Sequence, residues 1–515
     1  GFDDLPSKEG FYAASSETAK VLNGKTLGEK ISLPGPFGST RNFLINGITS
    51  TYRWLLQEAQ KRVNSLNKSE IPILSLSVPQ NDNGADFSHV HAMLKKQSEH
   101  IRHSLQIYAN GPITIGILSQ LLGRNVIDII SGWPLDAPPL YVCTGTNDER
   151  NNAVNLLIRA NADYVIDAAT IAELGIVECL DVLSILPRVY ISTKAIEVLE
   201  AHLDEANTAR SNGSMYDENG RMRFVEFSEK EKSRRKSLAQ KMLDAAKDYC
   251  ITLPAYGPVE IPKALHKFQE VLSDEEYAAL LLSSEKNATL FSIDGRLSQI
   301  GKAENNFTSV WPQEVIRFAV ERKKLESRKY HFAVISMFLR KRSFISLGPL
   351  DLVFMCLQGG YILQEGLQRF KEYLSSASSE YNSVLQVAFD FLELQAQHRT
   401  QVKAFAELLE HILEAVLRHP ESTHPELLAQ ADMVITRIAF ANNRQMIPYA
   451  LVEEDREARI LSFIKAFKVS IQKATKFAAT PLQCREIKLY VLHCKSSPLL
   501  MHGEPPKLSI AVNPA

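Results

Sequence analysis

The chain has 515 residues, which is too long for one hydrophobic core and suggests about three domains of ~150 residues each. Its hydrophobic fraction of 45% and charged fraction of 23% are those of an ordinary globular protein. A formal net charge of -1 excludes a globally basic coat for binding nucleic acid, although local basic patches stay open.

The 6 cysteines are scattered and contain no CxxC pair. This pattern favours reduced thiols over a disulfide framework or a zinc site. No apolar stretch is long enough to span a bilayer, and the first residues do not form a secretory signal. We therefore expect a cytoplasmic protein without a membrane partner. Because the first residue is Gly and not Met, we also expect that the sequence was trimmed from a longer chain.

Residues 1–139 are predicted to form a mainly helical N-terminal region. Apolar residues recur every three or four positions in residues 54–66 and 91–108, as in amphipathic helices. The polar residues 80–89 between them predict a loop, and the Pro- and Gly-bearing segment 32–40 is expected to be irregular.

Residues 140–345 are predicted to form an α/β domain, in which short β-type runs alternate with helical patterns. The β-type runs are 139–146, 162–167, 188–192, the end of 272–294 and the start of 307–320, and the helical patterns include 147–160, 171–186 and 192–206. This alternation predicts a parallel sheet flanked by helices. Residues from about 207 to 270 are expected to interrupt it as an insertion, with a hairpin at Asn219-Gly220 and a solvated helix at 228–241.

Residues 346–515 are predicted to form a helical C-terminal region. Helical spacing is clear at 348–360, 366–374, 383–397 and 402–419. No repeat of fixed period is present, so the pattern does not assign the region to a particular helical-repeat class.

Acidic residues occur where the predicted parallel sheet would bring them together. Asp167 and Asp294 each end an apolar β-type run, and Glu276 lies near the start of the helix before the second run. Glu197 lies one turn into the helix after residues 188–192, with Glu200 on the same helix face. The carboxyl ends of parallel strands and the adjacent helix starts line the crevice where such folds bind ligands.

Clustered carboxylates repel one another unless a cation neutralises them. Oxygen ligands in this number suit Mg²⁺ or Mn²⁺ better than zinc. Such a centre can activate a water and stabilise charge on a phosphodiester oxygen. The residues therefore indicate metal-assisted hydrolysis of a nucleic-acid backbone.

Residues 162–183, 188–203 and 275–297 resemble the successive blocks of a PIN-domain nuclease, and the resemblance covers about residues 140–320. The sequence is also similar to the PIN modules at the ends of large bacterial tetratricopeptide-repeat proteins. The resemblance implies a PIN-like α/β fold between helical regions. It also implies Mg²⁺- or Mn²⁺-dependent endoribonuclease activity, with single-stranded RNA as the preferred substrate.

The resemblance also assigns site residues. Asp167 matches the first acid of the family and Glu276 the helix acid, while Asp294 matches the strand-end acid with Ser292 two positions before it. The second acid of the family precedes a Leu, but here Val198 stands before Leu199. Glu197 and Glu200 flank that position, and Glu197 is preferred, with Glu200 as the alternative.

Each acid also has an ordinary structural interpretation. Asp294-Gly295 fits a plain turn, Asp167 fits a helix cap, and the glutamates fit solvated helix positions. The departure at the second acid leaves a different hypothesis open. In it the chain is a catalytically inactive PIN-like scaffold that binds protein partners through its helical regions.

Other candidate sites carry weaker signals. Neither a Gly-rich phosphate loop nor a local nucleophile signature is present. Four histidines are close enough in sequence for metal binding, although a surface position fits them better: His89, His91, His100 and His103. Two basic groups could contact RNA, and the second is the better candidate: Lys230, Lys232, Arg234, Arg235 and Lys236, and then Lys323, Lys324, Arg328, Lys329, Arg340, Lys341 and Arg342.

Overall fold

The computed structural model describes residues 17–34, 40–45, 80–81, 84–134, 136–159, 162–208, 213–218, 221–258, 263–305, 307–377, 379–397, 402–422, 424–440 and 453–477. The helix expected at residues 54–66 lies outside them. The chain divides into two compact units, residues 1–94 and residues 95–515. Within the described residues, no helix combines the length and the apolar character needed to cross a membrane.

The first unit contains helix α1 and two small antiparallel strand pairs in its described residues. The elements are α1 (Glu17–Leu22), β1 (Lys30–Pro34), β2 (Thr40–Leu44), β3 (Gln80–Asn81) and β4 (Gly84–Ala85), and the long helix α3 (Ser88–Asn110) follows. β1 pairs with β2, and β3 pairs with β4. The expected irregular segment 32–40 is therefore wrong at both ends, where Pro34 ends a strand and Thr40 begins one.

Five parallel strands form the central sheet of the second unit. They are β5 (Asp163–Ile166), β6 (Arg188–Ser192), β9 (Ile251–Leu253), β10 (Thr289–Phe291) and β11 (Ser309–Val310). The order in the sheet is β11-β10-β5-β6-β9, and each neighbouring pair is parallel. The predicted α/β fold with a parallel sheet is confirmed. Ile166 lies opposite Phe291, so β5 and β10 end side by side.

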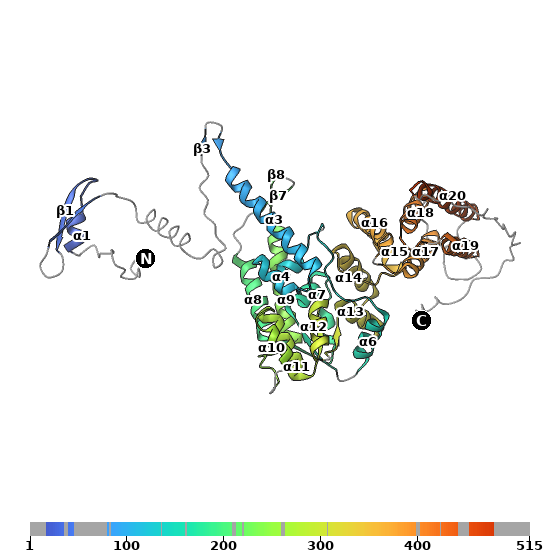
Figure 1. Ribbon diagram of the computed structural model, residues 1–515, viewed down its shortest axis with the longest axis horizontal. Helices are drawn as coiled ribbons and strands as arrows, with labels where there is room; N and C mark the ends of the chain where they lie inside the picture. The colour runs from blue at the N-terminus through green and yellow to red at the C-terminus, as the bar shows by residue number, and fades with distance from the viewer. Residues whose placement is uncertain are drawn as a thin grey trace. The chain divides into compact units, whose positions relative to one another are not determined.

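Helices surround this sheet, and α6, α8 and α11 contact its strands (Figure 1). The helices are α4 (Ile115–Leu122), α5 (Val126–Ser131), α6 (Asn147–Ile158), α7 (Ala168–Ile176), α8 (Thr193–Thr208), α9 (Glu229–Tyr249), α10 (Lys263–Phe268), α11 (Asp274–Lys286), α12 (Gly295–Asn305) and α13 (Pro312–Glu321). Because side chains alternate along a strand, Val165 packs with Leu280 of α11 in one core, while Ile166 packs with Ile171 of α7 in the other.

Three sequence expectations in this region differ from the structure. Residues 139–146 form no strand, and only an isolated bridge joins Leu140 to Arg342. The helix expected at 171–186 ends at Ile176, because Glu178 has a left-handed φ of 58° and a 3₁₀ helix follows at Leu180–Ile185.

The third difference concerns residues 207–270. The predicted hairpin is present as β7 (Gly213–Glu218) and β8 (Arg221–Glu226). The segment nevertheless does not interrupt the strand–helix alternation, because α9 leads into β9, which adds a fifth strand beside β6.

The C-terminal part of the second unit is helical, as predicted. Its helices are α14 (Ser327–Leu339), α15 (Pro349–Gln358), α16 (Gly360–Leu374), α17 (Tyr381–Gln397), α18 (Val402–Leu417), α19 (His424–Phe440) and α20 (Glu453–Phe477). From α14 to α20 each helix packs against the second helix along, as in stacked helix pairs of repeat proteins (Figure 1).

A buried ion pair connects the flanking regions to the α/β core. Arg342, just after α14, donates from Nη2 to Oε2 of Glu173 in α7 at 2.7 Å, and both side chains are 0% exposed. Arg342 also donates to the carbonyl of Ile130 at 2.9 Å, in the helical region before the sheet. One guanidinium therefore contacts all three parts of the unit.

Candidate functional site

Asp167 follows the last residue of β5 and is the N-cap of α7. Its Oδ1 accepts a hydrogen bond from the Thr170 N–H at 2.7 Å. Its Oδ2 is buried and no donor reaches it with hydrogen-bond geometry. Burial raises the pKa of this carboxyl, and the nearby Ser292 hydroxyl partly offsets that rise. The aspartate therefore uses one oxygen to cap a helix and presents the other without a donor, which is a costly arrangement unless a cation satisfies that oxygen.

Asp294 lies three residues after the end of β10 and directly before α12. Its Oδ1 accepts hydrogen bonds from the N–H groups of Arg296 and Leu297, at 2.8 and 3.3 Å, at the start of α12. Its own N–H donates to the buried hydroxyl of Ser292 at 3.0 Å. Because β5 and β10 are neighbours, Asp167 and Asp294 leave the sheet at the same edge.

Two adjacent glutamates lie in the first turn of α11, and both are buried. Oε1 of Glu275 accepts the N–H of Ala168, the residue after Asp167, at 2.7 Å. Glu276 forms a capping box with Ser273, in which the Ser273 hydroxyl donates to Glu276 Oε2 at 3.1 Å. We call these four buried carboxylates, Asp167, Glu275, Glu276 and Asp294, the acid cluster.

The first turn of α4 lies against the acid cluster. Thr114, the N-cap of α4, donates from its hydroxyl to Glu276 Oε2 at 2.9 Å. The Gly116 N–H donates to Glu276 Oε1 at 2.7 Å, and the Ile115 N–H donates to Asp294 Oδ2 at 2.5 Å. A Cβ on Gly116 would lie 2.2 Å from the carboxyl carbon of Glu276, so any larger residue there would displace the Glu276 carboxylate.

Burial governs the protonation of the acid cluster. It raises the pKa of Glu276 to about 7, with the nearby charge of Asp294 as the second cause, and it raises the pKa of Asp294 to about 6 against three N–H donors that lower it. Burial also raises the pKa of Asp167, and burial followed by the charge of Asp167 raises the pKa of Glu275 well above its usual range. Without a cation, the cluster therefore tends to hold protons near neutral pH.

The two glutamates proposed for the second acid lie elsewhere on α8. Glu197 is 59% exposed and pairs with Lys194 at 2.7 Å, and Glu200 is 48% exposed and pairs with Lys247 at 2.7 Å. Neither belongs to the buried acid cluster. Sequence reasoning missed Glu275, whose signal is the Ser273-to-Glu276 capping box that marks a helix start with three consecutive acids.

A second group of ligand-type side chains lies between α5 and α8. The ligand atoms of Asp128, His202 and Glu205 all lie within 4.8 Å of one another, and His202 Nδ1 is 3.6 Å from Asp128 Oδ1. Among the described residues, no three members of the acid cluster meet this spacing. With α4 in place, the carboxylates of the acid cluster are therefore more widely spread than a compact metal centre requires.

Aromatic side chains hold the segment beside Asp294. The Arg296 guanidinium lies over the ring of Tyr108, 4.0 Å from its centroid, and 5.7 Å from that of Tyr141. It also donates to the Ile113 carbonyl at 2.9 Å, immediately before α4. The Gly295 N–H donates to the Tyr141 carbonyl at 3.0 Å. Arg296 thereby links the strand-end aspartate to the α4 start.

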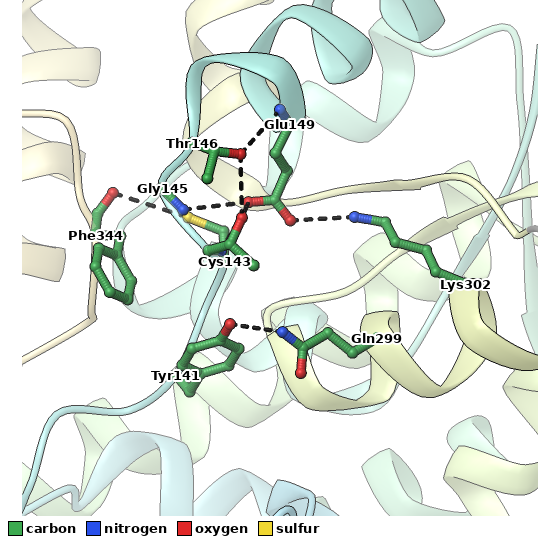
Figure 2. Close-up of polar contacts among 9 residues, drawn as sticks. Tyr141, Cys143, Gly145, Thr146, Glu149, Gln299, Lys302 and Phe344 are labelled. Carbon is green, nitrogen blue, oxygen red and sulfur yellow. Dashed lines mark hydrogen bonds and ion pairs between the residues drawn. The ribbon is translucent and has the colours of Figure 1, made fainter.

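Glu149 holds residues 143–146, which follow Tyr141 in the chain, in place (Figure 2). Its Oε2 accepts the N–H groups of Thr144 at 2.7 Å and Gly145 at 3.2 Å, and Lys302 of α12 donates to its Oε1 at 3.1 Å. Burial raises the pKa of Glu149, but the bonds from Thr144 and Lys302 outweigh burial and lower it below the ordinary value. The carboxylate is thus a structural anchor between residues 143–146 and α12.

The basic groups differ from their sequence interpretation. In the second group, Arg342 is buried in the ion pair with Glu173, Arg340 donates to the Ser131 carbonyl at 3.1 Å, and Lys341 donates to the Ala137 carbonyl at 3.1 Å. These three side chains therefore serve the fold, whereas the other members of the group are exposed: Lys323, Lys324, Arg328 and Lys329. On α9, Arg234, Arg235 and Lys236 are exposed, as a solvated helix face requires.

The histidines of α3 do not form a metal group. Three of them are exposed, namely His89, His100 and His103, and His91 is half-buried. His100 contacts the Leu121 carbonyl through Nε2 at 2.9 Å. No group of three metal-ligand side chains among the described residues includes any of the four.

The second unit therefore has a parallel α/β sheet with acids beyond the carboxyl ends of two adjacent strands and more acids at the start of α11. Residues 165–303 match the family model of the PIN domain associated with the TPR-GreAB-C-PIN system, which supports a nuclease-like fold for this part of the chain. The chain therefore contains a PIN domain, and the resemblance seen in the sequence is confirmed. No curated protein and no solved structure matches the chain.

Proposed function

We propose that the chain is a metal-dependent endoribonuclease whose centre is the acid cluster. The observation that carries this proposal is the convergence of Asp167 and Asp294, at the ends of neighbouring strands, with Glu275 and Glu276 at the start of α11. Four buried carboxylates in one place destabilise a fold unless they serve a cation. The match to a PIN domain supports a nuclease over other metal chemistry.

The donor chemistry of the acid cluster suits Mg²⁺ or Mn²⁺, although in this structure no three of its described carboxylates lie within 4.8 Å of one another. All four side chains offer hard oxygen ligands, and Oδ2 of Asp167 is buried without a hydrogen-bond donor. Asp167, Glu275, Glu276 and Asp294 would hold the metal, with Glu275 in place of Glu197 or Glu200 as the additional acid. The bound metal supplies a lowered pKa for its water and neutralises charge on the phosphodiester.

The other residues of the site act by positioning. Ser292 accepts the Asp294 N–H, and the Thr170 hydroxyl accepts the N–H of Ile293 at 2.7 Å. These bonds fix the backbone from which the Asp294 carboxylate projects. Oδ1 of each aspartate is held by the helix that follows, so only the other oxygen is directed to the ligand. The site is therefore built on rigid elements.

The test is cleavage of a labelled single-stranded RNA with Mn²⁺ as cofactor. We expect the wild type to cleave and Asp294→Asn and Asp167→Asn to lose cleavage with the fold intact. Glu197→Gln is the matched control, because this exposed glutamate should not affect cleavage. Equal cleavage by the wild type and both aspartate variants would remove the acid cluster from the mechanism.

One observation favours a second candidate function. Two carboxylates of the acid cluster already accept hydrogen bonds from N–H groups of α4. A non-catalytic PIN-like scaffold could retain these carboxylates for that structural role alone. In this alternative, the stacked helices α14 to α20 would bind protein partners. A thermal-shift titration separates the two functions, because Mn²⁺ should stabilise a metal enzyme through Asp167 and should leave a scaffold unchanged.

We also propose a cytoplasmic location. Cys143, Cys179 and Cys250 are buried and free, and burial raises the pKa of each thiol to about 12. Thiols of this kind are typical of proteins in reducing compartments. Localisation of a tagged full-length protein by fractionation tests this assignment.

A further inference from the structure

The first turn of α4 donates hydrogen bonds from N–H groups to two carboxylates of the acid cluster. At the start of any α-helix, the first N–H groups have no partner within the helix. Here those of Ile115 and Gly116 donate to Asp294 Oδ2 and Glu276 Oε1, and the third, of Ile117, donates to the Thr114 hydroxyl at 3.3 Å. The carboxylates thus serve as the acceptors that cap α4.

A metal ion and these N–H groups would compete for the same oxygens. The positive end of the α4 dipole partly replaces a cation electrostatically, since a helix N-terminus favours negative charge. The backbone of α4 also approaches Glu276 directly, because the Glu276 carboxylate lies within 2.5 Å of the place of a Gly116 Cβ. Asp294 is 1% exposed and Glu276 is 3% exposed, so no phosphodiester reaches them while α4 is in place.

We propose that the first turn of α4 is an autoinhibitory plug, which must leave Glu276 and Asp294 before a divalent cation and RNA can enter the acid cluster. This inference rests on the proposed metal-dependent function and adds a means of regulation. The plug is held by Thr114 on Glu276 and by Arg296 on the Ile113 carbonyl. Gly111–Thr114, without regular structure, precede α4, and Gly123, with φ of 58°, follows it. Ile115 and Leu118 of α4 are buried in the core, so opening of the plug must also release these side chains.

The first experiment measures Mn²⁺ affinity by calorimetry with full-length protein. All proteins carry His202→Ala, so that the group of Asp128, His202 and Glu205 does not contribute. Thr114→Val removes the hydroxyl that caps α4 and contacts Glu276 while keeping the side-chain shape. We expect it to lower the Kd for Mn²⁺ about tenfold, because one of the bonds that close the plug is lost.

Two variants serve as controls. Thr114→Ser keeps the hydroxyl and should bind Mn²⁺ like the wild type. Asn125→Ala removes a comparable N-cap from α5, where the side chain accepts the Ile127 N–H at 2.9 Å, without touching the acid cluster. It should lose stability without gaining affinity for Mn²⁺, which separates opening of the plug from general loosening of the fold.

Hydrogen exchange supplies the second readout. The N–H groups of Ile115 and Gly116 should be protected in the free protein, because their acceptors are buried carboxylates. Mn²⁺ should accelerate their exchange, and Asp167→Asn should abolish this effect. Faster exchange of these N–H groups on addition of Mn²⁺, together with tighter Mn²⁺ binding by Thr114→Val, supports the plug.

The remaining outcomes distinguish the two proposals. One outcome is that Mn²⁺ binds through Asp167, but the hydrogen exchange of Ile115 and Gly116 does not change and Thr114→Val binds Mn²⁺ no more tightly. This outcome overturns the plug and leaves the metal centre. An opening plug without RNA cleavage overturns the nuclease function and leaves the plug. If neither the wild type nor Thr114→Val binds Mn²⁺ through Asp167, both proposals fail.

Discussion

The Gly116 N–H and the Glu276 carboxylate lie 2.7 Å apart although 160 residues separate them in the chain. The bond joins the helical region before the sheet to the PIN domain. It also makes residue 116 an unusually restrictive position, because its backbone approaches a carboxylate directly.

Gly116→Ala should destabilise the protein by about 1–3 kcal/mol, since the added Cβ overlaps the Glu276 carboxyl group. The measurement is urea unfolding with EDTA present. In the double variant Gly116→Ala, Glu276→Ala, part of this loss should disappear, because the overlapping group is gone. Strictly additive effects of the two substitutions would contradict the contact.

The metal-free protein should lose stability as pH rises from about 5 to about 7.5. Glu276 and Asp294 have pKa values raised to about 7 and about 6 in the folded state, above their ordinary values of 4.5 and 3.8. The folded protein therefore binds more protons in this range than the unfolded chain, and its stability declines as they dissociate. Thermal unfolding at several pH values measures the decline, which should be smaller in Glu276→Gln. A slope unchanged by this variant would show that Glu276 does not titrate as described.

The ion pair between Glu173 and Arg342 should be sensitive to loss of one partner. Both side chains are 0% exposed, so Arg342→Met leaves a buried charge without a partner, at a cost of about 3–5 kcal/mol. Replacing both, in Glu173→Leu with Arg342→Met, should recover much of this. Glu197→Gln, which breaks an exposed pair with Lys194, should cost less than about 1 kcal/mol. Chemical unfolding of the four proteins tests this order, and a mild effect of Arg342→Met would refute it.

Glu149→Ala should release residues 143–146 without unfolding the domain. It removes the acceptor of the Thr144 and Gly145 N–H groups and the partner of Lys302. Faster hydrogen exchange is expected in that segment. Asp148→Ala, at the exposed neighbouring position in the same helix turn, should leave the exchange unchanged. Equal protection in both variants would assign the order of the loop to other contacts.

Local patterns in the sequence were sufficient for much of the sheet and for two of the acids. The interpretation of Asp167 as a helix cap holds together with its place in the acid cluster. Asp294, which was interpreted as a turn residue, likewise accepts an N–H group at the start of α12 while it belongs to the cluster. Capping and cluster membership do not compete, because a carboxylate has two oxygens. Glu275 was missed because its neighbour Glu276 was already assigned to the site from the sequence. Both residues are nevertheless buried, since the first turn of α11 lies against the end of the sheet.

Long-range contacts explain the other differences. Residues 139–146 have the composition of a strand, but their N–H groups bind side chains instead: that of Tyr141 donates to the Tyr108 hydroxyl and that of Val142 to Ser343, each at 3.0 Å. Strand β9 consists only of Ile251–Leu253, which is too short for the sequence to show a strand pattern. The contact of α4 with the acid cluster has no local signature at all, since it depends on where distant segments meet.

Some hydrogen-bond donors to the acid cluster come from outside the stretch that matches the PIN domain, and this affects how the chain can be divided into fragments. Residues 165–303, which match the PIN domain, contain the four acids but neither Thr114, Ile115 and Gly116 nor Arg342. An excised copy of that stretch would present bare, mutually repelling carboxylates and the unpaired Glu173. As a recombinant fragment or as an evolutionary module, it would need a divalent cation or acidic solution to fold. In the longer chain, the N–H groups of α4 and the Arg342 guanidinium stabilise these carboxylates instead.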